Sequence, residues 1–289
     1  MSPVNNRPTA TSAPRAFITE SPATLAAWVA AIAQREIPVV SDTDALLDEL
    51  RPNEDALDAH LVADVVVVDP LMTLKLLRWV AALRAGRDES NPETTTEALV
   101  MLGITPFFRH FKQQPTIEQA LASIPAALLG LRQVMRRAHR AAAFALGFAV
   151  HRGDYDAPQI HEAALLHDFA EMLLWAHAPT QALALKAYQA SHPQRRSVEA
   201  QQAVLHIALG DLQQALMTTW RLPPLLVQIT DDHDSPRAQV RNVQLAIRLA
   251  RHSAQGWDHP ALADDVEQIA DLLTMGVQPT LKLLHELNS

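Results

Sequence analysis

Three short segments of the sequence carry residue types that could do chemistry, and each contains a histidine. His139 lies in an Ala-rich stretch, His167 is followed directly by Asp168, and His233 lies in an acidic run that begins at Asp231. Imidazole nitrogens and carboxylate oxygens bind divalent cations, and the same groups also form hydrogen-bonded pairs inside protein cores. A metal centre and a buried polar network are therefore both open interpretations of these residues.

His139 falls on an apolar stripe of a long predicted helix. The stripe repeats at steps of three, four and seven residues, which is the spacing of one helix face, and it consists of Leu128, Leu131, Met135, Ala142, Leu146 and Ala149. The arginines of the segment fall on another face; they are Arg132, Arg136, Arg137 and Arg140. We therefore expect His139 to point inward, where a hydrogen-bonded core histidine is more common than a metal ligand.

His167 and Asp168 lie in the segment AALLHDFAEMLLW, residues 163–175. This segment is apolar on nearly every helical face, which predicts one buried helix over residues 159–176. An Asp inside a buried helix lowers helix propensity and loses hydration unless a partner satisfies it. Adjacent residues project about 100° apart on a helix, so the two side chains can hydrogen-bond to each other or converge on a divalent cation.

The third segment, WRLPPLLVQITDDHD, covers residues 220–234. Its two prolines fix a helix junction, and Asp231, Asp232, His233 and Asp234 then cluster at the next helix end. A solvated acidic helix end is the simpler interpretation. The functional interpretation places His233 in the same cavity as His167.

The composition limits the classes of function. The formal net charge is −8 and the pI is near 5.9, so we expect no direct nucleic-acid binding through a basic face, because phosphate affinity comes from clustered Lys and Arg. The chain has no cysteine, which excludes disulfides and thiolate ligands or nucleophiles. It also has no apolar run of membrane-spanning length. We therefore expect a cytoplasmic protein without membrane contact.

The elements that must position these residues are predicted to be helices throughout. Residues 1–22 are rich in Pro, Ser and Thr and predict a disordered leader, followed by a helical subdomain over 23–118 and a second over 119–289. Capping residues precede many of the apolar segments, as in Asp69-Pro70, Thr94-x-x-Glu97 and Thr116-x-x-Gln119. The helices are expected at roughly 25–34, 70–85, 94–102, 105–113, 119–150 with an interruption at Pro125, 159–176, 179–190, 197–219, 223–232, 236–254, 261–274 and 277–287.

One segment is ambiguous in its local preference. The β-branched run from Val65 to Val68 favours a strand by propensity. However, Leu57, Leu61, Val65 and Val68 recur at helical spacing, and no hairpin turn or second strand lies nearby. The spacing predicts a helix, and the fold class is all-α.

Taken together, the segments resemble the HDOD family, the HD-related output domain of bacterial signalling proteins. The similar segments are, in order, DPLMTLKLLR at 69–78, ALVMLG at 98–103, ALLHDFAEMLLW at 164–175 and WRLP at 220–223. The resemblance implies a multi-helix fold in which an N-terminal helical bundle packs on a larger half related to HD-type metal phosphohydrolases. It also implies signal transduction as the usual function.

The resemblance further implies a vestigial metal site. HD hydrolases hold a divalent metal such as Mn, Mg or Fe through a first His, a His-Asp dipeptide and a later Asp, and the metal activates water and polarises phosphate. Carried over to this chain, these become His139 and the dipeptide His167-Asp168, with His233 as a further candidate. The later Asp falls at Ile247, which cannot ligate a metal. The family's other common His falls at Leu209, and the second His of its His-His pair at Asp234.

The remaining departure concerns charge. The Gly-Lys that usually follows the dipeptide is Ala170-Glu171 here, so a carboxylate would face an incoming phosphate. The resemblance therefore favours a non-catalytic regulatory module that contacts another signalling protein and needs no cofactor.

Two other functions stay open. The first is a metal-dependent phosphohydrolase acting on a nucleotide or cyclic dinucleotide, with Asp231 or Asp232 completing the ligands. The second is nucleotide binding without turnover, through Arg136, Arg137 or Arg140.

Overall fold

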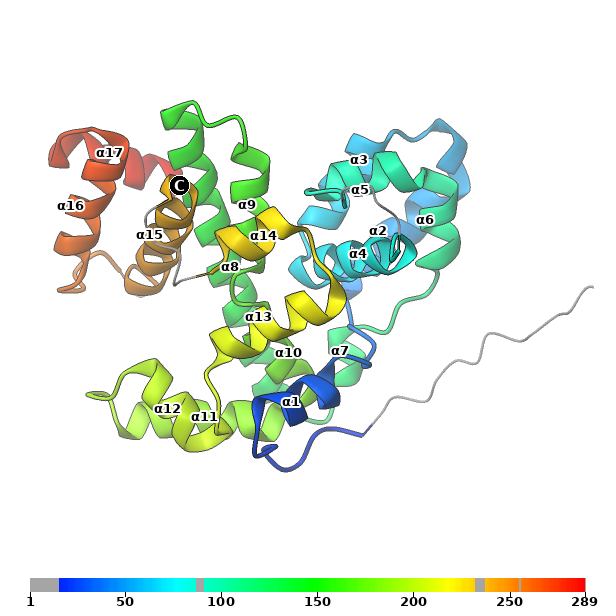
Figure 1. Cartoon of the computed structure of the whole chain (residues 1–289), viewed down its shortest axis with the longest axis horizontal. Coiled ribbons are helices and arrows are strands. Elements are labelled where there is room, and N and C mark those ends of the chain that lie inside the picture. The colour runs from blue at the N-terminus through cyan, green and yellow to red at the C-terminus, as the bar shows by residue number, and fades with distance from the viewer. Residues whose placement is uncertain (1–15, 87–90, 232–236, 255, 289) are drawn as a thin grey trace, which may run out of the picture.

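The protein is helical in the computed structural model, which describes residues 16–86, 91–231, 237–254 and 256–288 (Figure 1). These residues contain no strand, and a single parallel bridge joins Val39 to Thr116. The all-α class expected from the sequence is confirmed. The β-branched run is helical as well, since the helix that contains it continues to Val67.

The N-terminal half is a small bundle around one buried helix, α4. Asp69 starts α4 as expected, because its buried carboxylate accepts hydrogen bonds from the backbone N–H groups of Leu71 and Met72. Helices α3 and α5 pack side by side and both contact α4. The elements of this half are α2 (Ser41–Leu50), η1 (Arg51–Ala56), α3 (Ala59–Val67), α4 (Pro70–Leu83), α5 (Thr95–Leu102), α6 (Ile104–His110) and α7 (Ile117–Ala120).

The second half is arranged around one long helix, α8, which begins at Pro125, the residue at which the interruption of the 119–150 helix was predicted. Helices α9, α10, α11 and α15 contact α8 along its length. The other elements of the chain are α1 (Leu25–Ile32), α8 (Pro125–Arg152), α9 (Ala157–Leu166), α10 (Phe169–His177), α11 (Pro179–Ser191), α12 (Ser197–Leu205), α13 (Leu209–Trp220), α14 (Pro224–Ile229), α15 (Ala238–His252), α16 (Leu262–Leu273) and α17 (Val277–Leu287). No helix of the described part combines the length and apolarity that a membrane span requires.

Two helices predicted as continuous are each broken in two. The helix expected at 159–176 is interrupted at His167 and Asp168, where Asp168 leaves the helical conformation and α10 begins at Phe169. The helix expected at 197–219 is interrupted at His206, whose φ of 65° is left-handed and ends α12. Asp168 therefore occupies a helix junction rather than a helix interior.

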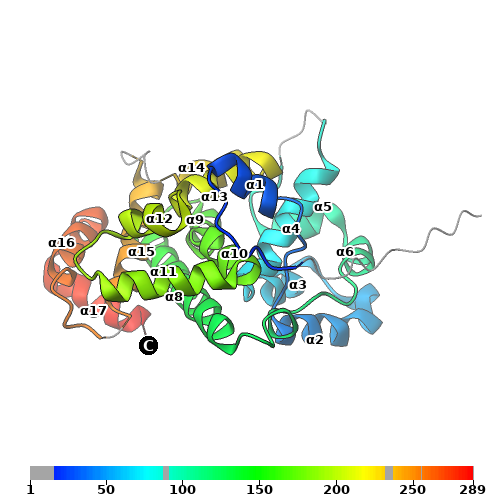
Figure 2. The same ribbon diagram turned by 90° about the horizontal axis from the view of Figure 1, so that it is seen from below.

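The first helix belongs with the second half. Helix α1 lies against α13 (Figures 1 and 2), and the indole N–H of Trp28 donates to the carbonyl of Leu205 over 2.9 Å. The sequence-based division, with one subdomain over residues 23–118, stays a prediction. Before α1, the N–H of Ile18 donates to the carbonyl of His177 and the hydroxyl of Ser21 to that of Val204. Residues 1–15 of the leader lie outside the described residues.

The segment between α1 and α2 joins the two halves through side chains of α4 and α13. The Lys75 ammonium donates to the carbonyl of Ile37 over 2.9 Å, and the Arg78 guanidinium donates to the carbonyls of Arg35 and Ala33. The indole of Trp220 donates to the same Ala33 carbonyl. Side chains of the K-L-L-R and W-R-L-P segments therefore donate hydrogen bonds to backbone carbonyls of the same segment, the one that links α1 to α2.

A second contact between the halves is a buried carboxylate. Glu162 of α9 accepts hydrogen bonds from the backbone N–H of Thr95 over 2.8 Å and from its hydroxyl over 3.0 Å. Burial raises the pKa of Glu162 to about 7, although the hydrogen bonds from Thr95 partly oppose this. The folded protein therefore binds this proton more tightly than the unfolded chain, whose glutamate titrates near 4.5.

We expect the stability that Glu162 contributes to fall as the pH rises from about 4.5 to about 7, because the folded state must then ionise a buried group. Glu162→Gln should remove this slope, which amounts to at most about 3 kcal/mol across the interval. Urea unfolding of both proteins at several pH values measures it. The exposed Glu199→Gln on α12 is the control and should follow the wild type. Parallel curves for wild type and Glu162→Gln would refute the assignment.

Candidate functional site

Asp168 lies at the α9–α10 junction, and its side chain is 7% exposed. Its Oδ2 accepts from Arg137 of α8, over 2.7 Å from Nη2 and 3.1 Å from Nε. Its Oδ1 accepts from Nη2 of Arg251 on α15 over 2.8 Å and lies 3.2 Å from Nδ1 of His167. Each carboxylate oxygen is therefore bound by a guanidinium.

A second carboxylate completes this cluster, which we call the Asp168 cluster: Arg137, His167, Asp168, Glu171 and Arg251. Glu171, one turn into α10, lies 2.6 Å from Nη2 of Arg137. Burial alone would raise the pKa of Asp168, but Arg251, the hydrogen bond with His167 and Arg137 together hold it well below its usual value. Burial would lower the pKa of Arg137, but Asp168 and Glu171 raise it. The cluster thus contains two arginines and two carboxylates that balance in charge.

The structure brings His167 and Asp168 together but leaves His139 elsewhere. Residues two apart on a helix project about 200° apart, so His139 points away from the face on which Arg137 reaches Asp168. It is half-buried, its imidazole forms a hydrogen bond with the backbone of Val68, and it lies near His161. Burial lowers the pKa of His139, partly offset by the hydrogen bond with Val68. The expected inward orientation is therefore met only in part.

The other site residues predicted from the sequence do not join the Asp168 cluster in the described part of the chain. Ile247 and Leu209 are 3% and 7% exposed and belong to the hydrophobic core. His233 lies outside the described residues, as do Asp232 and Asp234, whereas Asp231 follows the end of α14. Within the described ranges, no three His, Asp or Glu side chains are arranged to hold a metal ion.

A divalent metal, which the family resemblance implies, does not fit the described residues of this site. A hard cation needs carboxylate lone pairs, and both oxygens of Asp168 accept hydrogen bonds from arginine. A cation placed there would also meet two positive charges within a few ångströms. The position that the resemblance gives to a later ligand, Ile247, lies one turn before Arg251 on the same helix face.

Arg137 and Arg251 were not predicted as partners of Asp168. A signal for them was present, because a buried carboxylate needs a cation and each arginine lies close to a position assigned to a ligand. Arg137 precedes His139 by two residues, and Arg251 follows Ile247 by four. Arg140, considered for nucleotide binding, instead donates to the Ala250 carbonyl.

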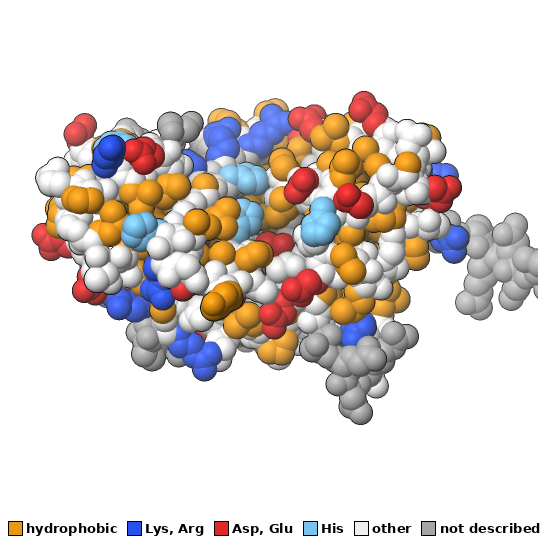
Figure 3. Space-filling model, turned by 90° about the horizontal axis from the view of Figure 1, so that it is seen from above, with side chains coloured by type: hydrophobic (Ala, Val, Ile, Leu, Met, Phe, Trp, Pro, Cys, Tyr) orange, Lys and Arg blue, Asp and Glu red, His pale blue; other side chains and the backbone are white. Residues whose placement is uncertain are grey.

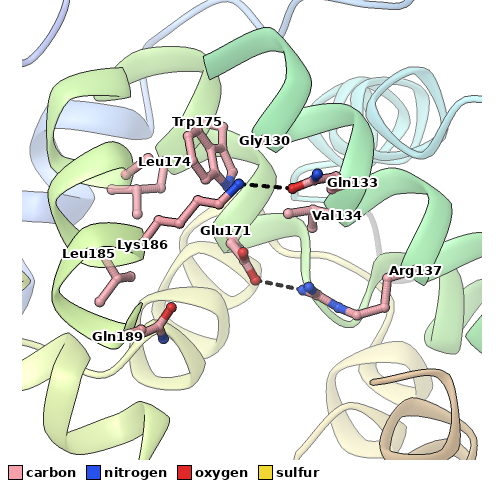
Figure 4. Close-up of a pocket in the computed structure, with 11 residues that line it drawn as sticks. Gly130, Gln133, Val134, Arg137, Glu171, Leu174, Trp175, Leu185, Lys186 and Gln189 are labelled. Carbon is pink, nitrogen blue, oxygen red and sulfur yellow. Dashed lines mark hydrogen bonds and ion pairs between the residues drawn. The ribbon is translucent and has the colours of Figure 1, made fainter. Parts of the chain in front are cut away.

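A small cavity of about 170 Å³ adjoins the Asp168 cluster between α8, α10 and α11 (Figure 4). Trp175 lies beside Gly130, where a Cβ atom would stand 2.5 Å from the indole ring, so only glycine fits there. Two cations line the cavity, and each has a partner: Lys186 donates to Gln133 over 3.1 Å, and Arg137 binds Glu171. The cavity therefore presents no cation that is without a partner.

The chain is similar to a known domain family and to solved structures. The family model of the HDOD domain matches residues 37–236. The response regulator MmoQ of Methylococcus capsulatus str. Bath is similar with a TM-score of 0.62 and 18% identity, covering 87% of this chain and 99% of that one. A virulence factor of Campylobacter jejuni subsp. jejuni is similar with a TM-score of 0.59 and 15% identity, covering 90% and 97%. No curated protein matches significantly.

These two solved structures share the fold, and the fold alone follows from identities this low. The family model, in contrast, spans more than half of the sequence, from Ile37 to Pro236. It includes the DPLMTLKLLR, ALLHDFAEMLLW and WRLP segments on which the resemblance rested. The chain therefore belongs to the HDOD family.

Proposed function

We propose that this protein is a non-catalytic signal-transduction module that acts by contacting another signalling protein. The observation that carries the proposal is the Asp168 cluster, in which two guanidinium groups bind the carboxylate that holds a metal in HD hydrolases. A protein cation in the place of a metal supplies no bound water to activate and no open coordination position.

Two further features support the same function. Glu171 places a negative charge beside Arg137, which reduces the attraction of the cluster for a phosphate. Ile247 and Leu209, to which the resemblance assigns ligand positions, are apolar and buried in the core. A module without a metal site acts through its helical surface, and a response regulator shares the fold.

The test is turnover by the full chain, purified without chelator. We expect no hydrolysis of bis-p-nitrophenyl phosphate, p-nitrophenyl phosphate or a cyclic dinucleotide above the rate of Mn²⁺ alone, and less than one-tenth of an equivalent of transition metal by elemental analysis. Hydrolysis that His167→Ala abolishes, while the exposed His60→Ala retains it, would replace this proposal with the phosphohydrolase.

A further inference from the structure

Helices α3 and α5 form an outer layer of the N-terminal half. Both pack on α4, whose residues from Pro70 to Leu77 are all buried, and on each other. The inner side of the layer consists of Val62, Ala63 and Val66 on α3 and of Ala98 and Leu99 on α5. The opposite sides of the two helices therefore face outward together.

The outward side of this layer carries large apolar side chains. Leu61 of α3 is 45% exposed and Val68, the residue that caps the C-terminus of α3, is 63% exposed, while Val100 and Met101 of α5 are 64% and 46% exposed. Elsewhere exposed apolar side chains occur mostly on single helices, as at Leu46 of α2, which is normal for a protein surface. Here four lie on or directly after two helices that pack against each other, and a gathering of exposed apolar side chains of this kind is typical of an interaction site.

Acidic side chains lie between and around these apolar ones. Asp64 is exposed between Leu61 and Val68, and Glu97 is exposed one turn before Val100 and Met101. Neither helix contains a Lys or Arg. Figure 3 looks onto this side of the molecule, and hydrophobic and acidic side chains lie together over its right-hand half. We call this surface the α3–α5 face, defined by Leu61, Asp64, Val68, Glu97, Val100 and Met101.

The charge of the α3–α5 face limits what can cover it. A second copy of the chain would place Asp64 and Glu97 against the same residues in a two-fold contact, and this like-charge pairing is unfavourable. Anionic lipid headgroups and nucleic-acid phosphates are repelled for the same reason. A partner with apolar side chains flanked by Lys or Arg satisfies both components of the surface.

The shape favours one form of such a partner. Two adjacent helices present a ridge-and-groove surface into which the side chains of a third helix pack, and amphipathic helices are recognised in this way through apolar anchors at i, i+3, i+4 and i+7. We propose that the α3–α5 face binds a basic amphipathic helix of a partner protein. This rests on the proposed function and names the chemistry of its partner.

The test uses a fluorescein-labelled synthetic 21-residue helix with Leu at heptad positions a, d and e and Lys at the others. We expect it to bind the full chain in an anisotropy titration, with an affinity that falls as NaCl rises from 50 to 300 mM. Val68→Ser/Val100→Ser and Asp64→Lys should each weaken binding at least fivefold. All three positions are solvent-exposed, so the variants should fold, which thermal unfolding verifies.

Matched controls lie on α12 of the other half. Val198 is 55% exposed and Glu199 is exposed beside it, so Val198→Ser and Glu199→Lys should leave the affinity unchanged within twofold. A peptide with Glu in place of Lys should not bind.

Several results would overturn the inference. They are equal losses in the α12 variants, no loss in the α3–α5 variants, or equal binding of the Glu peptide. A dimer that Val68→Ser/Val100→Ser dissociates would assign the face to a second copy, and binding to phosphatidylserine vesicles that the same variant abolishes would assign it to a membrane. None of these outcomes affects the turnover test, so the failure of this inference can be told from the failure of the proposed function.

Discussion

Replacing Asp168 with alanine is expected to lower the free energy of unfolding at pH 7 by about 3 kcal/mol. Removing one member of a buried ion pair leaves the partner charge uncompensated, which costs about 3–5 kcal/mol. The lower end applies here because the side chain of Arg251 is 46% exposed and can regain water, and Arg137 keeps Glu171. Urea unfolding monitored by circular dichroism measures the loss.

The control for this prediction is an exposed ion pair. Asp48 binds Arg51 over 2.8 Å with its side chain 46% exposed, and Asp48→Ala should change stability by about 0.5 kcal/mol or less. If Asp168→Ala proved no more destabilising than Asp48→Ala, the Asp168 cluster would contribute nothing to the fold. Should the alanine variant fail to fold, Asp168→Asn, which keeps the shape and one acceptor, is expected to lose about half as much.

The pH dependence of the Asp168 cluster has the opposite sign to that of Glu162. The pKa of Asp168 is held below its ordinary value of 3.8, so its contribution is complete at neutral pH and is lost only as the pH falls below 3.8 through the lowered folded-state value. Below pH 3.8, the free energy of unfolding should therefore fall less steeply with decreasing pH in Asp168→Ala than in the wild type. The same titrations that test Glu162 show this.

Much of the fold could be predicted because the helices are amphipathic and capped. The Thr94 and Thr116 hydroxyls accept from the N–H three residues on, as the capping spacing predicts. Helix α2, in contrast, was not predicted: it buries only Thr43 and Leu47, so its apolar period is too weak to read in the sequence SDTDALLDEL.

The helix break at Asp168 was missed for the opposite reason. Residues on both sides are apolar, and no Gly or Pro marks the junction between α9 and α10. The packing of α1 on α13 depends on Trp28 and Leu205, which are 177 residues apart. Contacts between such distant residues leave no trace in local periodicity, so the packing of α1 on α13 could not be predicted.

The contacts of the site, like those of the fold, could be predicted where they are local in sequence and not where they are distant. That Asp168 would be buried and paired with His167 could be predicted from neighbouring residues. Its pairing with Arg137 and Arg251 spans 31 and 83 residues and depends on α8 and α15 packing together around the α9–α10 junction. The ligand positions that the resemblance implies, His139 and Ile247, lie within about one helical turn of the two arginines. A shift of one turn is enough to change which side chain reaches the carboxylate of Asp168.

Restoring the missing ligand is expected not to restore a metal site. Ile247 is buried in the core, so Ile247→Asp places a carboxylate among apolar side chains, with Arg251 one turn away on the same helix. We expect a loss of about 3 kcal/mol, from lost apolar contacts and desolvation. Addition of 1 mM MnCl₂ should leave the thermal midpoint of the variant unchanged, because the two arginines that hold Asp168 repel a second cation.

Ile247→Asn is the matched control, since it has nearly the same shape and polarity without the charge. Both variants should respond to Mn²⁺ as the wild type does, with no shift beyond that produced by KCl of equal ionic strength. A rise in midpoint with Mn²⁺ in the Asp variant alone would mean that a cation can displace Arg251 from Asp168 once a third ligand is present. In that case the fold still brings metal ligands together and the arginines only compete with the cation for Asp168, so the metal-free interpretation of the Asp168 cluster fails.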